Sequence, residues 1–398
     1  MRVLLIDVNC KDSSTGRIVY DIYASLNAQG DMAAVCYGRG KQIYEQNIYK
    51  FGLDWETKLH ALLTRLTGFT GCFSFFSTKR LIQYIEDFRP DVVHIHELHA
   101  YFVNIATLLN YLADRRIKVV HTLHCEFSYT GKCGHSIDCE KWMKECGNCP
   151  RVKAYPKSLF FDQTRAMFRK KKEAFARIQN LTIVAPSEWL SERARNSFFS
   201  NRPIYTVHNG VDTAVFYPRD TKAIRKELGI DEKEKVVLSV APHLMSESKG
   251  GRFILRLAKR MKEKARFVLV GVDGESLRKD ENIILMGPVY DKNRLAELYS
   301  LADTFCICSI RENFPTTCLE AQSCGTPICG FDTGGTKETC ITPIHGQFVV
   351  FGDLEALERC VMNVPQKPNE IASWLSENAG TILGYAEMEK RYREIYCS

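Results

Sequence analysis

Residues 304–330 read TFCICSIRENFPTTCLEAQSCGTPICG, and this stretch contains one complete strand–helix–strand pattern. Residues 304–308 and 327–330 are short apolar runs of the kind that form buried strands. Between them, Thr316 and Thr317 open a helical pattern that Gly325 closes, because threonine favours helix starts and glycine favours helix ends. A strand, a helix and a second strand in this order predict one βαβ unit of a parallel sheet.

The same alternation extends along the rest of the chain. In the first half, short β-branched runs predict strands at residues 3–6, 91–95, 118–122, 182–185 and 204–207. After an irregular stretch that contains Pro218, the pattern restarts with strands at residues 236–240, 266–270 and 283–286. We therefore predict an α/β protein with two doubly wound, Rossmann-like domains.

The length of the chain also favours two domains, because 398 residues exceed the size at which one hydrophobic core keeps growing. We place the boundary after Asp212, since an Asn-Gly turn there is followed by an irregular, proline-containing stretch. The expected domains are residues 1–212 and 213–380, and residues 381–398 should form a closing helix that returns to the first domain. Ligands of such sheets bind beyond the carboxyl ends of the strands, so the expected active site is a cleft between two facing domains.

The composition is that of a soluble globular protein, with 45% hydrophobic and 25% charged residues. Asp7 interrupts the first apolar run too early for a signal peptide, and no apolar stretch reaches the length of a spanning helix. Sixteen cysteines without an export signal indicate reduced thiols or metal ligands rather than disulfides. The expected location is the cytoplasm. Peripheral attachment to the inner face of the plasma membrane is a further expectation.

Two segments leave a choice between a structural role and a lipid-binding role. Residues 165–177 combine six basic residues with apolar residues at near-helical spacing, which fits either a solvated helix face or docking on anionic lipids. The basic residues are Arg165, Arg169, Lys170, Lys171, Lys172 and Arg177. An aromatic run fits the core or a partly exposed rim, with lipid contact as the lesser alternative; it consists of Phe69, Phe73, Phe75 and Phe76.

Chemistry concentrates in the loop and helix of residues 309–338. Glu312 follows a buried strand and precedes Pro315, which prevents the next helix from extending backwards. The helix that begins at Thr316 points its amino end into this loop, and such an end stabilises a phosphate without a metal. Glu320 can then accept hydrogen bonds from ribose hydroxyls, while Glu312 can accept them from a sugar beyond the diphosphate. In the alternative interpretation, Glu320 only completes a capping box that starts at Thr317.

The string resembles the E-x7-E signature of retaining glycosyltransferase family 4, with Glu312 and Glu320 as the two glutamates and Gly334-Gly335 in register. That family has the GT-B fold, in which two Rossmann-like domains face each other across a cleft. Residues 13–17, 90–96, 208–212, 249–250 and 287–290 are also similar to family segments, so the resemblance covers nearly the whole chain. It implies that Glu312 is catalytic and that these residues bind the nucleotide sugar: Gly16, Arg17, Lys249, Val289, Asn313, Phe314, Pro315, Thr316, Thr317 and Glu320.

The sequence departs from the family pattern at two places. Relatives usually carry an arginine near the lysine that pairs with the donor phosphates, whereas this chain has His243 and Ser248 at those positions. Arg252 or Arg17 are the candidates to replace it. His124 is similar to the family's strand-end histidine near the donor sugar, which implies a catalytic role. The next residue is Cys125 where relatives of this subtype often have aspartate, and Glu126 is the candidate to fill that role.

A cysteine-rich loop at residues 125–150 follows directly. Four of its cysteines, Cys133, Cys139, Cys146 and Cys149, fit either a structural zinc site or a group of reduced thiols. A four-thiolate ion has no open position, so a catalytic zinc is not expected. A similar loop occurs in a subset of family 4 enzymes from bacterial surface-polysaccharide biosynthesis. His94, His96 and His99 fit either a metal site or a buried strand end that faces the acceptor.

The resulting prediction is transfer of a hexose from a nucleotide diphosphate sugar to an acceptor sugar hydroxyl, with retention of configuration. The expected acceptor is a lipid-linked glycan of exopolysaccharide, capsule or O-antigen assembly at the inner membrane, and no nucleic acid is expected as a partner. No catalytic metal is expected, because the leaving phosphate can take the acceptor's proton. The alternatives are a GT-B-fold sugar-nucleotide epimerase, a sugar-phosphate transferase, and a catalytically inactive, zinc-stabilised binding protein.

Overall fold

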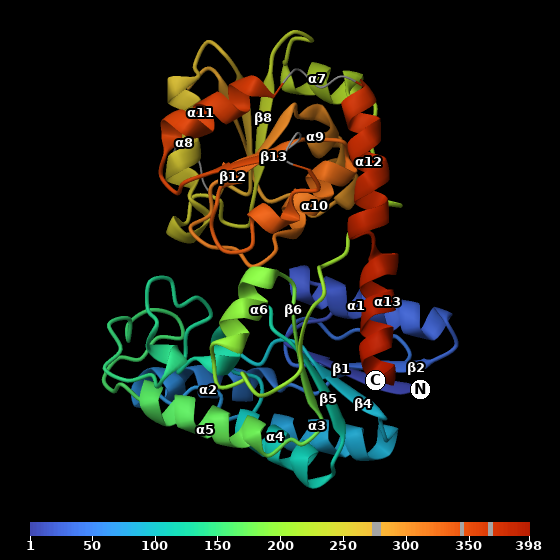
Figure 1. The fold of residues 1–398 in the computed structure, drawn as a ribbon, viewed down its shortest axis with the longest axis vertical. Coiled ribbons are helices and arrows are strands. Elements are labelled where there is room, and N and C mark those ends of the chain that lie inside the picture. The colour runs from blue at the N-terminus through green and yellow to red at the C-terminus, as the bar shows by residue number, and fades with distance from the viewer. Residues whose placement is uncertain (273–279, 343–345, 365–368) are drawn as a thin grey trace. The chain divides into compact units, whose positions relative to one another are not determined.

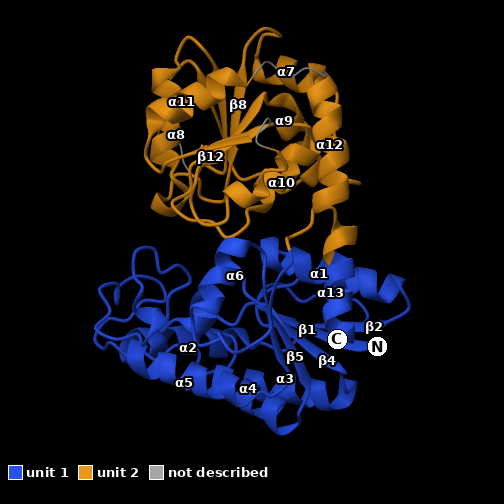
Figure 2. Cartoon of the chain, viewed as in Figure 1, with its two compact units in different colours: residues 1–207, 389–398 blue, residues 208–388 orange. Residues whose placement is uncertain are grey.

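The computed structural model describes residues 1–272, 280–342, 346–364 and 369–398. These residues form two compact units, shown in Figure 2. Unit 1 consists of Met1–Val207 and Glu389–Ser398, and unit 2 consists of His208–Met388. The division therefore lies slightly before the boundary at residue 212 that the sequence suggested.

All residues of unit 1 are described, and they contain a seven-stranded parallel sheet in the order β3-β2-β1-β4-β5-β6-β7 (Figure 1). Its strands are β1 (Arg2–Asp7), β2 (Met32–Tyr37), β3 (Ile48–Lys50), β4 (Val92–Ile95), β5 (Lys118–Thr122), β6 (Leu181–Ala185) and β7 (Ile204–Thr206). Strands β2 and β3 were not predicted from the sequence. Alanines at positions 33 and 34 lower the strand propensity of β2, and β3 is a three-residue edge strand.

Helices connect these strands on both faces of the sheet (Figure 1). They are α1 (Ser14–Ala28), α2 (Asp54–Thr67), α3 (Phe75–Phe88), α4 (Ile105–Asp114), α5 (Thr164–Ala176) and α6 (Glu188–Arg195). Helix α5 contains most of the basic segment that was expected to be helical. Between β5 and α5 the chain makes two short 3-10 turns, η1 (Phe127–Tyr129) and η2 (Lys141–Met143).

The described residues of unit 2 contain a six-stranded parallel sheet in the order β10-β9-β8-β11-β12-β13. The strands are β8 (Val236–Val240), β9 (Arg266–Val270), β10 (Ile283–Met286), β11 (Thr304–Ile307), β12 (Ile328–Phe331) and β13 (Gly346–Val349). The helices and 3-10 turns are α7 (Lys222–Leu228), η3 (Glu247–Lys249), α8 (Gly251–Arg260), α9 (Lys292–Leu301), α10 (Thr316–Ser323), η4 (Lys337–Thr339), α11 (Leu354–Asn363) and α12 (Asn369–Leu383).

Unit 2 has a hydrophobic core on each face of its sheet. Neighbouring residues of one strand enter different cores: Leu238 packs with α9 and α10, and Val237 packs with α8 and α11. Successive side chains of a strand point to opposite faces, so a sheet covered on both sides consists of nearly continuous apolar runs. This is why the apolar runs of the sequence predicted these strands.

The C-terminal segment is divided between the units. It was expected as one closing helix over residues 381–398, but α12 ends at Leu383 and α13 (Tyr385–Cys397) begins after Gly384. The end of α13 belongs to unit 1, where the Tyr392 and Tyr396 hydroxyls lie 3.0 Å and 2.6 Å from Thr122 Oγ1 and His94 Nδ1. These contacts join the last turns of the chain to the ends of β4 and β5.

The strand orders locate the expected ligand positions within each unit. The chain reverses its direction across the sheet between β1 and β4 in unit 1, and between β8 and β11 in unit 2. Ligands of doubly wound sheets bind beyond the carboxyl ends of the strands at such reversals. Within the described residues, no helix has the length and apolar character needed to cross a membrane.

Candidate functional site

In unit 2, the chain reversal brings together two of the predicted site residues. Lys249 ends η3 in the connection after β8, and Glu312 lies in the loop between β11 and α10. The Lys249 ammonium is 2.7 Å from Glu312 Oε1, and the two side chains are only 30% and 18% exposed. A cation and a carboxylate are thus held together at the place where this fold type binds ligands.

Backbone contacts fix the loops that carry this pair. The Ile310 amide donates to the Ser248 carbonyl at 2.9 Å, and the Gly335 amide donates to the Glu312 carbonyl at 2.9 Å. Gly334 has a φ of 66°, and a Cβ atom there would lie 2.0 Å from the Glu312 oxygen. Because only glycine fits at this position, the Gly334-Gly335 pair of the motif has a direct role in placing Glu312.

The residues after Glu312 form the base of the same loop. Asn313 and Phe314 are buried, and the Phe314 ring stacks on the His208 ring with centroids 4.6 Å apart. Asn209 Nδ2 donates to the Phe314 carbonyl at 3.2 Å. Residues 208–212, which are similar to a family segment, therefore support the candidate site.

Helix α10 begins after this base, at Thr316, as predicted. Its N-cap is Pro315, and no side chain caps its first turn. The first amides of a helix have no partner within the helix, and together with the helix dipole they favour an anion. Thr316 and Thr317, both half-buried, are the residues whose amides stand at this end.

Glu320 is buried on α10, and its Oε2 accepts a hydrogen bond from the Tyr299 hydroxyl at 2.8 Å. Burial and the Glu320 carboxylate hold the pKa of Tyr299 well above its usual value, so Tyr299 stays a donor. The capping-box alternative requires Thr317 as N-cap, whereas the helix already starts at Thr316. That alternative is wrong, and Glu320 is instead oriented by Tyr299.

Unit 2 also contains Val289, predicted to bind the donor, and the positions at which the missing arginine was considered. Val289 is half-buried against the core, in the loop that follows β10. His243 and Ser248, which occupy the positions of the family arginine, are both exposed. Arg252 is exposed on α8, with its guanidinium carbon 4.9 Å from the centre of the Phe253 ring.

In unit 1, the chain reversal places the glycine loop beside Asp7. Ser13 caps α1 by accepting from the Gly16 amide at 3.2 Å, and a Cβ atom on Gly16 would lie 3.1 Å from the Asn9 carbonyl. Arg17 follows on α1 and is half-buried. Asp7 accepts from the Glu97 amide at 3.0 Å, and burial together with Glu97 raises the pKa of Asp7 to about 7.

His124 lies at the end of β5 and pairs with His96, whose Nδ1 is 2.9 Å from His124 Nε2. Burial lowers the pKa of both imidazoles, so His124 is neutral at pH 7. Both ring nitrogens of His94 contact hydroxyl groups, those of Tyr396 and Thr122. His94 is therefore a buried strand-end residue, and the proposed metal site of His94, His96 and His99 is wrong.

One cluster was not expected from the sequence. His99 Nε2 is 2.8 Å from Glu97 Oε2, and Cys125 Sγ is 3.5 Å from the same oxygen. Although burial opposes it, His99 lowers the pKa of Glu97 to about 2. The cluster joins residues after β4 to a residue after β5, so only the strand order could have predicted it.

Glu126 does not replace the missing aspartate. It is fully buried, accepts from Arg193 Nε at 2.7 Å and from the Ser136 amide at 2.6 Å, and so organises the cysteine-rich loop. The basic helix α5 is also structural. Phe168, Phe175 and even Lys171 are buried, which favours the solvated-face interpretation for its remaining cations.

Comparisons with known proteins agree with this architecture. The profile of Glycosyltransferase Family 4 matches residues 15–215, and that of Glycosyl transferases group 1 matches residues 220–380. A putative colanic acid biosynthesis glycosyl transferase, WcaC of Escherichia coli, is 23% identical over 85% of each chain. N-acetyl-alpha-D-glucosaminyl L-malate synthase of Bacillus anthracis is 28% identical over 44% of this chain and 48% of its own.

Solved structures match over nearly the full length. Sucrose-phosphate synthase of Thermosynechococcus elongatus superposes with a TM-score of 0.69 at 15% identity, covering 99% of this chain and 98% of its own. HepE of Anabaena in complex with UDP-glucose gives a TM-score of 0.65 at 16% identity, again covering 99% and 98%. With both halves matched by family profiles, this chain belongs to the family 4 glycosyltransferases and has the GT-B fold.

Proposed function

We propose that this glycosyltransferase moves a hexose from a nucleotide diphosphate sugar to a hydroxyl group of a glycan acceptor, with retention of configuration. The observation that carries the proposal is the Lys249–Glu312 pair beside the amino end of α10. These groups offer positive charge to a diphosphate and a carboxylate to the neighbouring sugar. The structure of HepE with UDP-glucose, a protein of the same fold, supports a nucleotide sugar as donor.

The chemistry follows from these groups. Lys249 and the first amides of α10 stabilise the negative charge that develops on the departing diphosphate. Glu312 orients the hexose, Glu320 accepts from the ribose, and Val289 lies near the base. The leaving phosphate takes the proton of the acceptor hydroxyl, so the mechanism requires neither a catalytic metal nor a separate base.

On the acceptor side, unit 1 supplies His124 and the glycine loop. A neutral His124 can accept or donate one hydrogen bond to the transferred sugar without adding a charge beside it. Gly16 and Arg17 are the donor-binding residues that we propose in unit 1, because they match the family's glycine loop. Cys125 stands in the place of the family's aspartate, and its thiol bonds to Glu97, which makes Glu97 a candidate for the missing carboxylate.

The proposed pathway is the assembly of a cell-surface polysaccharide on a lipid carrier. The similarity to a protein of colanic acid biosynthesis over most of the chain supports this. WaaG, described as a glycosyltransferase involved in lipopolysaccharide biosynthesis, shares the fold with a TM-score of 0.60 at 12% identity, and each chain is covered to 99%.

A lipid-bound acceptor requires a membrane-facing surface, and we propose α2 for this role. The buried side chains of this helix are polar: Glu56, Thr57, His60 and Thr64. Its exposed large side chains are apolar and 39–54% exposed: Trp55, Leu59, Leu62 and Leu66. A surface helix normally has the opposite arrangement. The apolar stripe of α2 is therefore suited to contact with the apolar interior of a lipid bilayer.

The inverted arrangement of α2 is stabilised by its buried polar groups. Glu56 accepts from the amides of Phe76 and Ser77 at 2.8 Å and 2.7 Å, and so caps the start of α3. His60 Nδ1 lies 2.8 Å from the Ser74 hydroxyl. Rotation of α2 would bury the leucines only by breaking these bonds, which cost about 1–3 kcal/mol each when a partner is lost.

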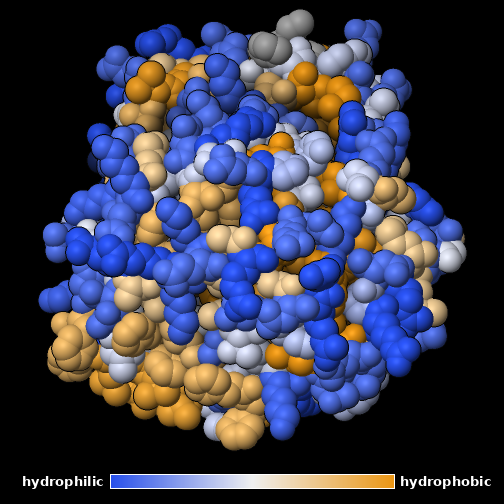
Figure 3. Space-filling model, turned by 60° about the horizontal axis from the view of Figure 1, so that its bottom comes forward, coloured by the Kyte–Doolittle hydropathy of each residue, from blue (hydrophilic) through white to orange (hydrophobic). Residues whose placement is uncertain are grey.

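The apolar surface extends beyond α2. Trp55 contacts Phe76 with ring centroids 5.9 Å apart, and the amide of Leu159 donates to the Arg65 carbonyl. The added exposed residues are Phe75, Phe76, Leu159, Phe160 and Phe161. Figure 3 shows a broad area of apolar residues at the lower left of its view. Exposed Lys58, Arg65 and Lys79 accompany these residues on α2 and α3, which favours an anionic bilayer as the occupant.

The enzymatic proposal is tested first with a thermal-shift screen of the full chain against UDP, GDP, ADP and their hexose conjugates. One diphosphate should raise the melting temperature selectively, because a ligand of the native state stabilises it. Glu312→Gln should then retain diphosphate binding and lose sugar transfer by about a hundredfold or more. Unchanged transfer by Glu312→Gln would refute the proposed site, and an isomerised donor without acceptor would indicate the epimerase instead.

The membrane proposal is tested with sedimentation of phosphatidylglycerol-containing vesicles. Leu59→Glu with Leu62→Glu should lower vesicle binding by about tenfold or more, since each leucine contributes about 1.5–3 kcal/mol when buried. Met362→Glu, at an exposed methionine in unit 2, is the matched control. Equal binding of both variants would contradict the assignment, and a dimer that the leucine variants dissolve would identify the surface as a self-association face.

A further inference from the structure

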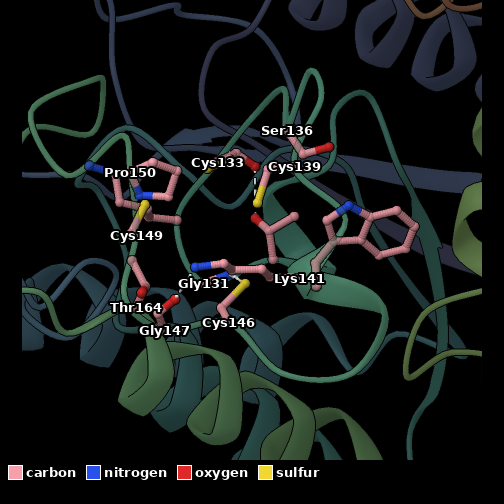
Figure 4. A pocket seen from close by; sticks show the side chains of 13 residues that line it. Gly131, Cys133, Ser136, Cys139, Lys141, Cys146, Gly147, Cys149, Pro150 and Thr164 are labelled. Carbon is pink, nitrogen blue, oxygen red and sulfur yellow. Dashed lines mark hydrogen bonds between the residues drawn. The ribbon is translucent and has the colours of Figure 1, made fainter.

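Four of the five cysteines in the loop after β5 line one pocket, which Figure 4 shows at close range. Cys133, Cys139, Cys146 and Cys149 are all half-buried, as reduced thiols. The other side chains around the pocket include Lys132, Lys141 and Trp142. The sugar-transfer proposal uses none of these groups.

The loop has little regular structure to hold it. Between β5 and α5, residues 123–163 contain only the two 3-10 turns η1 and η2. Structureless connections longer than about 12–15 residues are uncommon in compact domains and need another source of order. The fully buried Glu126 and Trp142 supply part of it, because Glu126 bonds to Arg193 and the Trp142 ring packs on Tyr129 at 5.1 Å. The half of the loop that holds the cysteines lies around the pocket.

The segment from Cys146 to Cys149 has the C-x2-C spacing of metal-binding knuckles. Cys146 and Cys149 are separated by Gly147 and Asn148, which both have positive φ angles, 150° and 45°. Lys141 Nζ donates to the carbonyls of these two residues, at 3.2 Å to Gly147 and 2.7 Å to Asn148. These contacts hold the turn between two cysteines whose C-x2-C spacing is typical of pairs that share one metal ion.

An amide is already directed at one of the sulfurs. The Gly131 N–H donates to Cys146 Sγ at 3.1 Å. Hydrogen bonds from outside the ligand set orient metal-binding groups and stabilise their charge. A neutral thiol is a weak acceptor, so this contact suits a thiolate better.

The charges around the pocket favour an anionic complex. Four thiolates on one Zn²⁺ carry a net charge of −2. Lys132 is 4% exposed, and its ammonium bonds to the carbonyls of Val152 and Ala154 at 2.6 Å and 2.8 Å. A buried ammonium held by carbonyls benefits from a nearby anion, and Lys132 and Lys141 both line this pocket.

The sulfur atoms are more widely spaced than the ligands of a bound ion. Tetrahedral Zn–S bonds of about 2.3 Å place sulfur atoms about 3.8 Å apart. Among the described residues, three or more potential ligand atoms lie within 4.8 Å of one another at Glu97, His99 and Cys125, and not at the four cysteines of the pocket. The cavity between the cysteines is about 20 Å³, the space of one water molecule, so a small inward movement of the loop closes it on an ion.

We propose that Cys133, Cys139, Cys146 and Cys149 bind one structural Zn²⁺ and that this ion orders the loop that follows His124. Binding converts four thiols to four thiolates and releases four protons, with no change of oxidation state. The site has no open coordination position, so the ion does not enter the sugar-transfer reaction. The ion affects activity only by fixing the position of the loop.

The test is metal analysis of the full chain, purified under reducing conditions without added metal. We expect about one Zn²⁺ per chain in the wild type and about a tenfold loss in Cys146→Ser and Cys149→Ser. Cys340→Ser, at a half-buried cysteine of unit 2, is the matched control and should keep the ion. Cys125→Ser should also keep it, and loss of zinc in that variant alone would move the site to Glu97, His99 and Cys125.

A second measurement avoids variants that fail to fold. The wild-type protein, stripped of metal and titrated with Co²⁺, should show the intense near-ultraviolet charge-transfer absorption of several thiolate ligands. Zinc added afterwards should displace it and protect the loop from proteolysis. A wild-type chain that contains no zinc and binds no Co²⁺ overturns the proposal, whatever its transferase activity.

Discussion

Gly334→Ala tests whether the position of Glu312 controls sugar transfer. The added Cβ would lie 2.0 Å from the Glu312 carbonyl oxygen, and ordinary contact begins at 3.4 Å, so the Glu312 loop must move by about 1.4 Å (3.4 minus 2.0). Misplacement by about 1 Å can lower a rate by about a hundredfold. The left-handed φ of 66° adds about 1–2 kcal/mol of strain for alanine, which lowers the melting temperature by several degrees.

The control separates strain from displacement. Gly229 ends α7 with a φ of 64°, and a Cβ there meets nothing within 4 Å. Gly229→Ala should therefore lose similar stability from strain and keep its activity. The assay is release of the nucleoside diphosphate from the sugar nucleotide that stabilises the protein most, measured as kcat/KM. If Gly334→Ala stays within about threefold of Gly229→Ala, the argument that this glycine positions Glu312 is wrong.

Two further predictions concern charge. Lys249→Met should weaken binding of the preferred nucleoside diphosphate by about 10–100-fold in calorimetry, because the ion pair to phosphate is lost. The control Lys259→Met, at an exposed lysine of α8, should leave the affinity unchanged, and equal affinities of the two variants would remove Lys249 from the donor site. The second concerns Glu97, whose pKa is lowered from 4.5 to about 2, which corresponds to about 3 kcal/mol at about 1.4 kcal/mol per pH unit. That stability is fully present above pH 4.5 and is lost as the pH falls toward 2, so wild-type melting temperatures should fall more steeply in this range than those of Glu97→Gln; parallel curves would contradict the ion pair with His99.

The sequence predicted the elements whose signals are local. The βαβ unit around α10 was recognised because apolar runs, a proline before the helix and a glycine after it all agree, and α10 begins at the predicted Thr316. The missed strands lack such signals: β3 has three residues, and β13 begins at Gly346. Their pairing comes from the neighbouring strands, which local propensity does not describe.

Some residues of the candidate site were likewise predicted from the sequence, and others were not. Lys249 and Glu312 are 63 residues apart, and both were assigned to the donor site from the family pattern, whereas the ion pair between them was not predicted. Glu97, His99 and Cys125 were not recognised as a cluster because only adjacent parallel strands bring them together. Helix α2 shows a further limit, since its leucines have the periodicity of a buried face and only the tertiary structure exposes them.

The contact between Lys249 and Glu312 also bears on the proposed donor site, where this chain departs from the family pattern. In the structure, the lysine neutralises the glutamate at 2.7 Å. A diphosphate at the amino end of α10 would compete with Glu312 for the same ammonium, because His243 and Ser248 stand where relatives carry a second cation. When Lys249 turns to the phosphate, it releases the Glu312 carboxylate, and this carboxylate then binds the hydroxyls of the sugar. Diphosphate alone should therefore bind less tightly than the full sugar nucleotide, since only the sugar compensates Glu312 for the lost ion pair.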